Sequence, residues 1–385
     1  MIGRWSTMES RTIIVGGGIA GLSCAMRLME RGEEFLLVTD LLGGRIRYSA
    51  EKNVNYGAYF VMSNYKYASR IVNRDKRINP LDACFHNDEK TCFSTLSLHT
   101  LANLPGFIRF LSALMEFRKH YEVFKERCLG IPQKEALSRD PYLERLYYLP
   151  AADFIREKRI QKVAADYVAK FAYACTAADI DTITAFDFLN VSLGMVLPIY
   201  QLKFNHKAIA EKLGRHLIFD TISQIAPSSE GYVLTGKSGK TYLARNIVLA
   251  TPASVTQNLL NLPEIRKACQ IYVHHIKAVL KPQYRKRSLN LFPSASEFSL
   301  IAKQQDGTYL IYARKKDADL SKLCLEYEII GSQDWDQAMY VYGNEYLEQT
   351  WGEGLYIAGD HNGLGLEPSA ISGIYAANQI IGKTK

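Results

Sequence analysis

Long apolar runs are missing from this 385-residue sequence, as are closely spaced cysteine pairs and histidines at metal-ligand spacing. No apolar stretch approaches the ~18–20 residues that cross a bilayer. Residues 1–10 lack the apolar core of a signal peptide. The seven cysteines are scattered and odd in number, which suits a reducing compartment. These absences predict a cytoplasmic protein with free thiols and no metal site.

The charge is modestly basic, with 47 Lys and Arg against 39 Asp and Glu. The basic residues are spread along the chain, and two short clusters lie at residues 285–287 and 314–316. The clusters suit solvated faces or, alternatively, peripheral contact with an anionic membrane surface. No nucleic-acid motif occurs, so we expect no nucleic-acid partner. The composition leaves the oligomeric state undetermined.

A strand, a glycine turn, a helix and a second strand follow one another between residues 11 and 38. In a G-x-G-x-x-G turn the first glycine makes the bend and the second lets the backbone approach a pyrophosphate. The third lets the helix pack closely on the strand. The N–H groups at the helix start then face the phosphates. The residues expected to contact a dinucleotide here are Gly16, Gly18, Ile19, Ala20 and Gly21.

The acid that holds the adenosine ribose in such units falls at position 39. This chain has Thr39 there, followed by Asp40. Either Asp40 reaches the ribose with a shifted register, or Thr39 makes a weaker neutral hydrogen bond. A charged acceptor is roughly twice as strong as a neutral one. The sequence leaves both alternatives open, together with the hypothesis that the chain has lost the cofactor.

Four further segments resemble flavoproteins of the amine oxidase, protoporphyrinogen oxidase and phytoene desaturase superfamily. They are Gly43-Gly44-Arg45, Asn55 to Phe60, Gly354 to Asp360 and Glu367 to Gly373. In that superfamily the Arg lies near the FAD pyrophosphate, the second segment lies against the flavin ring, and the Asp holds the ribityl chain. The resemblance implies FAD. It also implies non-covalent binding, because no cysteine lies in the closing segment where some relatives tether the flavin.

The resemblance extends the expected FAD contacts beyond the glycine turn. These are Gly44, Arg45, Gly57, Ala58, Tyr59, Ile222, Ala250, Thr251, Gly359, Asp360, Ser369, Ala370 and Ile371. The strand near Ile222 is expected to offer backbone groups to adenine. No second G-x-G-x-x-G occurs, so we expect no NAD(P)H domain and reoxidation by oxygen, a quinone or another acceptor.

These patterns predict an α/β fold, in which a discontinuous Rossmann-like FAD-binding domain joins an α+β substrate domain that carries a helical cap. The expected FAD-binding parts are residues 1–84, 205–265 and 343–385. The helical cap is expected over residues 85–204 and the substrate sheet over residues 266–342. The apolar spacing also predicts a helix over residues 61–72 and an amphipathic helix over residues 107–124.

Three side chains are candidates for catalysis. Amine oxidases carry a Lys, hydrogen-bonded through water to flavin N5, at the start of a strand comparable with residues 276–280. A buried Lys277 would have a depressed pKa and could orient that water; the alternative is a lysine that faces solvent. His361 is a candidate for the ring edge, with a structural role as the alternative, and Tyr59 is a candidate for an aromatic wall.

The resulting hypothesis is an FAD-dependent oxidase or dehydrogenase that takes a hydride from a C–N or C–C bond of a mostly apolar small molecule onto flavin N5. Amine oxidases usually place a cage Tyr where this chain has Gly365, which resembles protoporphyrinogen oxidase more. A desaturase or protoporphyrinogen-oxidase-like enzyme is therefore one alternative. Another is a non-catalytic lipid or prenyl carrier like the GDP-dissociation inhibitors, although those lack the closing Gly-Asp signature.

Overall fold

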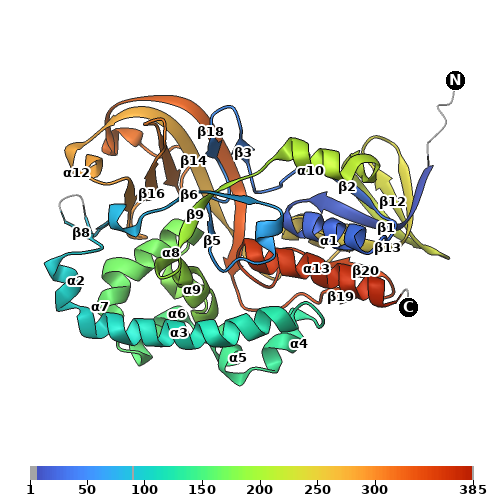
Figure 1. Cartoon of the computed structure of the whole chain (residues 1–385), viewed down its shortest axis with the longest axis horizontal. Helices are drawn as coiled ribbons and strands as arrows, with labels where there is room; N and C mark the ends of the chain where they lie inside the picture. Colours follow the sequence, from blue (N-terminus) through green and yellow to red (C-terminus); the bar gives the residue numbers. More distant parts are fainter. Residues whose placement is uncertain (1–6, 89–90, 384–385) are drawn as a thin grey trace.

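The computed structural model describes residues 7–88 and 91–383, which form a parallel sheet at one end and a second sheet with a helical layer at the other (Figure 1). The parallel strands, in spatial order, are β10 (Leu217–Phe219), β2 (Leu36–Leu42), β1 (Thr7–Gly17), β13 (Thr241–Leu249) and β20 (Leu355–Ile357). Antiparallel strands extend this sheet: β12 (Gly231–Gly236), β11 (Ile222–Ser228) and β19 (Thr350–Trp351). Ile14 packs on one side of β1, and Ile13 and Val15 on the other. The apolar run is therefore buried on both faces, as is typical of a parallel strand.

Two helices from opposite ends of the chain lie side by side on this sheet (Figure 1). They are α1 (Ile19–Glu30) and α13 (Leu366–Gly382). Glycines permit the close packing. A Cβ at Gly21 would lie 1.9 Å from the Gly16 carbonyl oxygen, and one at Gly373 would lie 2.0 Å from that of Ala20. The first and last parts of the chain therefore meet at the carboxyl end of β1.

The second sheet is mostly antiparallel. Its order is β18 (Cys324–Tyr342), β14 (Lys267–Leu280), β17 (Tyr309–Ala313), β16 (Phe298–Lys303), β15 (Leu289–Leu291), β7 (Ala83–His86) and β8 (Cys92–Ser94). Half of β7 and all of β8 come from the stretch predicted to begin the helical cap. A smaller sheet joins β5 (Phe60–Met62), β9 (Ile199–Lys203) and β6 (Asn73–Arg77).

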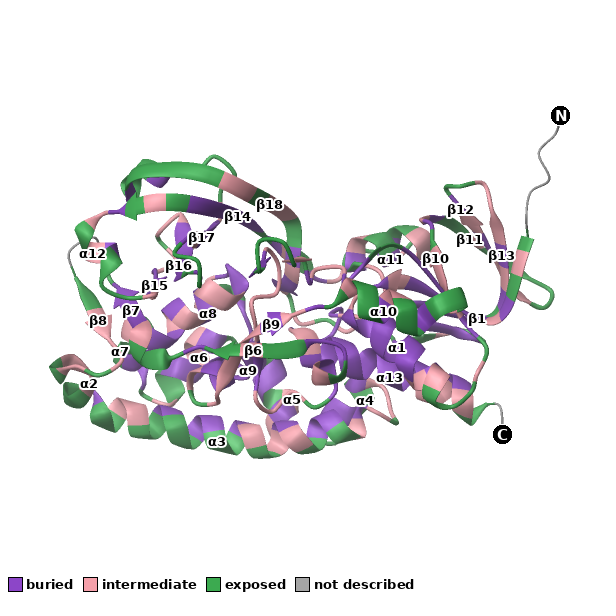
Figure 2. Cartoon of the chain, turned by 45° about the horizontal axis from the view of Figure 1, so that its top comes forward, coloured by how far each residue is buried: buried purple, intermediate pink, exposed green. Residues whose placement is uncertain are grey.

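The helical layer lies below the second sheet in Figure 1. Its helices are α2 (Leu98–Ala102), α3 (Leu104–Arg127), α4 (Gln133–Ser138), α5 (Pro141–Tyr148), α6 (Ala151–Glu157), α7 (Gln161–Val163), α8 (Ala169–Thr176) and α9 (Ala185–Ser192). In Figure 2, α3 is buried on one side and exposed along the lower edge of the molecule. Across residues 7–88 and 91–383, no helix has both the length and the apolar content needed to span a bilayer.

The prediction of a helix over residues 61–72 is wrong. Strand β5 ends at Met62, and only a single 3-10 turn forms, at Ala68–Arg70. The buried carboxylate of Glu367, at the start of α13, accepts hydrogen bonds from the backbone N–H groups of Lys66, Tyr67 and Ala68 at 2.6, 3.1 and 2.8 Å. This contact joins residues about 300 positions apart and fixes the turn. A prediction from the spacing of nearby apolar residues could not detect it.

A buried ion pair joins the helical layer to the second sheet. Arg266, just before β14, donates to the Asp187 carboxylate of α9 at 2.7 Å and to the Val341 carbonyl of β18 at 3.3 Å. Both charged side chains are almost completely buried. Each charge therefore depends on the other for compensation.

We expect Asp187→Asn to destabilise the fold by about 3–5 kcal/mol, because the Arg266 guanidinium would stay buried without its counter-charge. Urea denaturation measures this loss. The double variant Asp187→Leu with Arg266→Met should lose less, since no buried charge is left alone. Lys277→Met, which removes an exposed pair with Glu328, is the matched control and should leave stability unchanged. If Asp187→Asn were as stable as the parent, the Asp187 carboxylate would not be the charge that compensates buried Arg266.

Candidate functional site

The glycine turn lies at the carboxyl end of β1, where the chain order switches between β2 on one side and β13 on the other. Ligands of open α/β sheets bind at such points. Gly16 has a φ of +109°, and a Cβ there would lie 2.6 Å from the Ala250 carbonyl oxygen. In contrast, no atom lies within 4 Å of a Cβ built on Gly18. The second glycine therefore presents open backbone beside the turn.

The start of α1 is electrostatically suited to an anion. Among the described residues no side chain caps this end, and its first turn carries no acidic residue. The N–H groups of Ile19 and Ala20 belong to the first turn, whose donors have no partner within the helix. With the positive end of the helix dipole, they favour a phosphate next to Gly18.

The Thr39 hydroxyl is already engaged within the glycine turn. It is buried, accepts the Gly17 N–H at 2.9 Å and donates to the Leu41 carbonyl at 2.9 Å. This side chain therefore fixes the glycine turn from the neighbouring strand. Asp40 follows with an exposed side chain.

The second glycine pair packs directly on the first turn. Gly44 has a φ of +54°, and a Cβ there would lie 3.1 Å from the Gly18 Cα. The Ala58 N–H donates to the Arg45 carbonyl at 3.0 Å. A Cβ on Gly57 would lie 1.9 Å from that same carbonyl oxygen. Residues 44–45 and 57–58 thus form one layer against the glycine turn.

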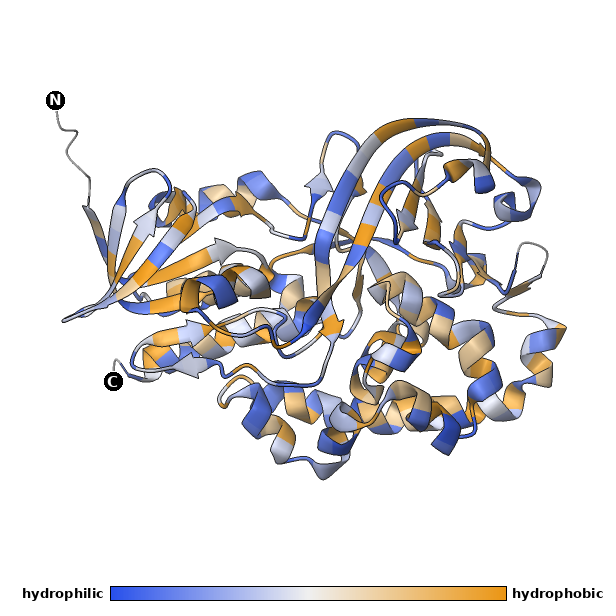
Figure 3. Ribbon diagram, turned by 180° about the vertical axis from the view of Figure 1, so that it is seen from behind, coloured by the Kyte–Doolittle hydropathy of each residue, from blue (hydrophilic) through white to orange (hydrophobic). Residues whose placement is uncertain are grey.

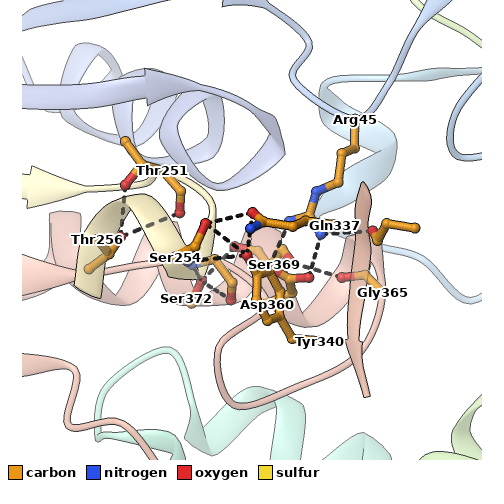
Figure 4. A network of polar contacts seen from close by, with 12 residues as sticks. Arg45, Thr251, Ser254, Thr256, Gln337, Tyr340, Asp360, Gly365, Ser369 and Ser372 are labelled. Carbon is orange, nitrogen blue, oxygen red and sulfur yellow. Dashed lines mark hydrogen bonds and ion pairs between the residues drawn. The ribbon is translucent and has the colours of Figure 1, made fainter. Parts of the chain in front are cut away.

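Arg45 and Asp360, 315 positions apart, form a bidentate ion pair (Figure 4). The two N–O distances are 2.7 and 2.6 Å, and Arg45 also donates to the Ala338 carbonyl of β18 at 2.9 Å. Burial alone would raise the pKa of Asp360, but the charge and hydrogen bonds of Arg45 hold it below its ordinary value. Asp360 is therefore ionised at neutral pH, and three distant parts of the chain converge on one guanidinium.

The closing segment is held by serines of α13. The Gly359 N–H donates to the Ser372 hydroxyl at 2.8 Å, and the Ser369 hydroxyl donates to the Gly365 carbonyl at 2.8 Å. Ala370 and Ile371, two of the expected cofactor contacts, are buried in the core. Ser372 was not among the residues that the sequence singled out.

Polar side chains of β18 and α11 (Ala253–Leu260) complete this corner, as Figure 4 shows. The Ser254 N–H donates to the Tyr340 hydroxyl at 3.1 Å, and that hydroxyl donates to Gln337 at 2.9 Å. The Arg45 guanidinium lies 6.0 Å from the centre of the Tyr340 ring, within reach of a cation–π interaction. Sequence analysis missed these three residues, since no local motif marks them.

The middle of the chain also reaches the glycine turn. The Ala250 N–H donates to the Val15 carbonyl at 2.8 Å, and the Thr251 hydroxyl bonds that of Thr256 at 2.7 Å. The Asp220 N–H donates to the Thr39 carbonyl at 3.0 Å, two residues before Ile222. Both segments expected to pass the cofactor therefore lie at this end of the sheet.

His361 is buried beside the Arg45–Asp360 pair. Neither ring nitrogen makes a well-aligned hydrogen bond to the described residues, although the Ala358 backbone lies close enough to act on the ring. Burial lowers the pKa of His361 to about 4, against the opposing charge of Asp360, so the ring is neutral at pH 7. A buried donor and acceptor without partners is costly unless a water or a ligand satisfies them. The imidazole is thus placed to meet a bound group.

Lys277 is not buried, contrary to the sequence-based expectation. Its side chain is 66% exposed, and its ammonium lies 4.0 Å from Glu328. Cys269, Ile271 and Val273 of the same strand face the main core. Further along, Ile276 and Leu280 are buried in a separate core, while Val279 is exposed like Lys277. Lys277 is therefore not assigned a catalytic role.

Tyr59 lies in an aromatic and amide environment. Its hydroxyl accepts a hydrogen bond from the Gln201 side chain at 3.0 Å, and its ring meets Tyr312 edge-on at 6.3 Å. Burial raises the pKa of Tyr59, so the hydroxyl is neutral at physiological pH.

Taken together, the residues present fit a dinucleotide. The open backbone at Gly18 and the uncapped start of α1 suit a pyrophosphate, and the partnerless imidazole of His361 suits a polar group nearby. The ribose end fits less well, because the Thr39 hydroxyl is already engaged. No group of three or more His, Cys, Asp or Glu side chains within the described ranges could hold a metal ion.

Comparisons with known proteins agree with this geometry. Residues 14–74 match the family model of the NAD(P)-binding Rossmann-like domain. A double mutant of putrescine oxidase superposes with a TM-score of 0.71 at 12% identity, covering 98% of this chain and 100% of that chain. Cyclohexylamine oxidase from Brevibacterium oxydans IH-35A gives 0.67 at 14% identity, covering 97% and 98%.

An oxidoreductase from Methanosarcina mazei gives a TM-score of 0.63 at 12% identity, covering 97% of this chain and 100% of that chain. None of the curated proteins matches the sequence. The chain therefore has a mixed α/β fold with a Rossmann-like dinucleotide-binding domain. More particularly, over nearly its whole length it has the fold seen in putrescine oxidase and cyclohexylamine oxidase.

The buried His361 predicts a pH-dependent stability. Its pKa falls from 6.5 to about 4 on folding. Below pH 6.5 the unfolded chain therefore binds a proton that the folded chain does not, and stability falls as the pH drops towards 4. His361→Gln lacks this titration, so its melting temperature should fall less steeply over that window. Circular dichroism melts measure both slopes. Above pH 6.5 the melting temperatures of the parent and the variant should change in parallel with pH. Equal slopes below pH 6.5 would show that His361 is not buried as a neutral imidazole.

Proposed function

We propose that this chain is an FAD-dependent oxidoreductase that acts on an uncharged, mostly apolar small molecule. The observation that carries the proposal is the bidentate Arg45–Asp360 pair, set beside two interlocked glycine turns at the switch point of the sheet. Distant parts of the chain converge there without a side chain in front of Gly18. The exposed backbone at Gly18 makes no contact that would stabilise the fold, so its openness supports a role in binding.

The chain's own residues would share the binding of FAD, which supplies the hydride-accepting chemistry when bound. Gly18 and the start of α1 would hold the pyrophosphate through backbone N–H groups. Asp360, kept ionised by Arg45, would accept hydrogen bonds from ribityl hydroxyls. Gly57 and Ala58 would hold the ring end, and the neutral His361 would offer it a hydrogen bond.

The side chains next to the ring-end segment carry no charge to pair with a cation. The hydroxyls of Tyr59, Tyr65 and Tyr312 are protonated at neutral pH with their ordinary pKa, and burial raises each pKa further. The nearby carboxylate of Glu367 is occupied by three backbone N–H groups. A cationic substrate would therefore lose its hydration without gaining a counter-charge from these residues.

Two bond types remain as candidates for the hydride donor. The amine oxidases that share this fold favour a C–N bond. The conformation of Gly365 favours a C–C bond, as in a desaturase or a protoporphyrinogen-oxidase-like enzyme. Its φ is +107°, and the Tyr65 hydroxyl lies 3.7 Å from the position of a Cβ. An aromatic cage wall at residue 365 would be strained. Oxygen or another acceptor would complete the cycle.

Gly18→Ala tests the cofactor site directly. No atom lies within 4 Å of the new Cβ, and the φ of −75° suits alanine, so the variant should fold as the parent does. The methyl group would occupy the approach of the pyrophosphate, and we expect at least about tenfold weaker FAD binding. Flavin fluorescence quenching measures the affinity. Gly382→Ala, also in open space, is the control and should bind like the parent.

Purified protein supplied with FAD should turn yellow and be bleached by dithionite. Anaerobic bleaching by a panel of apolar amines, apolar ring compounds and polyenes then separates the two bond types. We expect a mostly apolar member of the panel to bleach the flavin, and an amine to do so faster at a pH where more of it is deprotonated. Lys277→Met should be reoxidised as fast as the parent, because that lysine faces solvent. Protein that takes up no FAD from an excess would refute the proposed function.

A further inference from the structure

Four side chains that are distant in the sequence form a continuous series of hydrogen bonds at the second sheet. The Tyr56 hydroxyl lies 3.0 Å from Nδ1 of His275, and Nε2 of His275 lies 2.7 Å from the Thr308 hydroxyl. That hydroxyl donates to the Asp306 carboxylate at 2.6 Å. His275 and Thr308 are buried, whereas Tyr56 is half-buried and Asp306 is exposed. We call these four residues the Tyr56 network.

The direction of each hydrogen bond in the Tyr56 network follows from the carboxylate at its end. Burial alone would raise the pKa of Asp306, but its hydrogen bonds from Thr308 hold it below its ordinary value. The carboxylate is therefore ionised and only accepts. Because the Thr308 hydroxyl gives its one proton to Asp306, it must accept from the Nε2–H of His275. Burial lowers the pKa of His275 below 6.5, so at pH 7 its Nδ1 is free to accept the proton of Tyr56.

The charged groups around His275 suit a proton acceptor. Burial has the largest effect on its pKa and lowers it, the Asp306 carboxylate raises it, and the Lys52 ammonium lowers it slightly. A proton that reaches His275 is therefore stabilised by Asp306 through Thr308. The same proton is released again at neutral pH, because burial outweighs the carboxylate.

The backbone of β18 makes room for the contact between the phenol and the imidazole. Figure 3 shows β14 and β18 arching side by side over the second sheet, with polar residues between apolar ones. Gly331 of β18 pairs with His275 of β14, and a Cβ at Gly331 would overlap the Tyr56 hydroxyl. The Trp335 side chain of β18 donates to the Tyr56 carbonyl at 2.7 Å. Both contacts fix the position of Tyr56 against the two strands.

The Tyr56 network begins beside the ring end of the proposed cofactor site. Tyr56 directly precedes residues 57–58, which we place at the ring end. His275 lies two positions from the residue of β14 that pairs with Tyr312, so both side chains lie on one face of the sheet. Tyr59 meets the Tyr312 ring edge-on on this face. The phenol–imidazole pair and these two aromatic rings therefore border the same region.

We propose that Tyr56, supported by His275, accepts the proton that the substrate loses when it is oxidised; this inference rests on the proposed function. A substrate oxidised to a C=N or C=C bond loses a hydride, which leaves with its electron pair, and a proton. The electron pair of the broken bond to that proton becomes the second bond of the product. The Tyr56 oxygen binds the proton while its own proton moves to Nδ1 of His275. Thr308 and Asp306 hold the imidazole in the required tautomer and compensate the charge of the imidazolium.

Nitrogen NMR of isotope-labelled histidine tests the network without any substrate. In the cofactor-free protein, His275 should carry its proton on Nε2 and titrate below pH 6.5. Asp306→Asn should move this titration to lower pH, because the carboxylate that favours the imidazolium is lost. Added FAD should shift the His275 signals and leave those of His274, on the opposite face of β14, much less affected. A proton on Nδ1, or His275 signals that bound FAD leaves unmoved, would overturn the proposal.

The proton transfer itself is measured by anaerobic bleaching of bound FAD with the compound of the panel that bleaches the parent fastest. Tyr56→Phe and His275→Gln should slow bleaching by about a hundredfold. The parent rate should fall below pH 6.5, because a protonated His275 cannot accept the proton of Tyr56, and His275→Gln should lack this fall. His274→Gln is the matched control and should keep the rate and the pH profile of the parent.

Thr308 provides a test that separates positioning from packing. Thr308→Val keeps the volume of the side chain but removes the hydroxyl between the imidazole and Asp306, so we expect slower bleaching and a changed pH profile. Thr308→Ser keeps the hydroxyl and should retain most of the parent rate. An equal loss in both variants would contradict the role of the hydroxyl and with it the Tyr56 network.

The outcomes distinguish this inference from the function on which it rests. Protein that takes up no FAD, or bound FAD that no compound of the panel bleaches, would refute the proposed function and the inference together. Bound FAD that Tyr56→Phe and His275→Gln allow to be bleached at the parent rate, with the parent pH profile, would refute the inference alone.

Discussion

The bidentate pair of Arg45 and Asp360 is the constraint on which the site depends. A buried carboxylate is tolerated only where a counter-charge and good geometry compensate its lost hydration, and here one guanidinium supplies both. The same guanidinium donates to the Ala338 carbonyl of β18. The pair therefore fixes the closing segment against the first glycine turns and, at the same time, fixes the second sheet against the first.

Glycines make that convergence sterically possible. At Gly21 and Gly373 any side chain would overlap a neighbouring backbone, so α1 and α13 pack at backbone distance. Gly18 is different, since nothing in the structure requires its small size. The fold would accept a side chain at Gly18, and the absence of one leaves room for a ligand to approach the backbone. The open space at Gly18 is therefore stronger evidence for function than the backbone strain at Gly16.

The parts of the site that sequence analysis anticipated are local in origin. The glycine turn, the Gly44–Arg45 turn and the segment around Asp360 each carry a short sequence signature of their own, and their order along the chain predicted how they meet. The errors involve long-range packing. Lys277 is exposed because it lies with Val279 on the uncovered face of the end of β14, whereas Ile276 and Leu280 are buried in a separate core. The helix expected over residues 61–72 gave way to a turn held by Glu367. The apolar spacing within α3 could not reveal which of its two faces the protein covers.

Thr39 stands where dinucleotide-binding units usually have an acidic residue, and in this chain the threonine has a structural role of its own. Its hydroxyl satisfies the Gly17 N–H and the Leu41 carbonyl, so the glycine turn is ordered before any ligand arrives. A carboxylate at this position would instead direct a charged acceptor at a ribose. Pre-ordering reduces the entropy lost on binding, whereas a missing charged hydrogen bond reduces the enthalpy gained. The two effects oppose each other, so for the proposed cofactor the binding free energy would depend more on the contacts around Gly18 and Asp360.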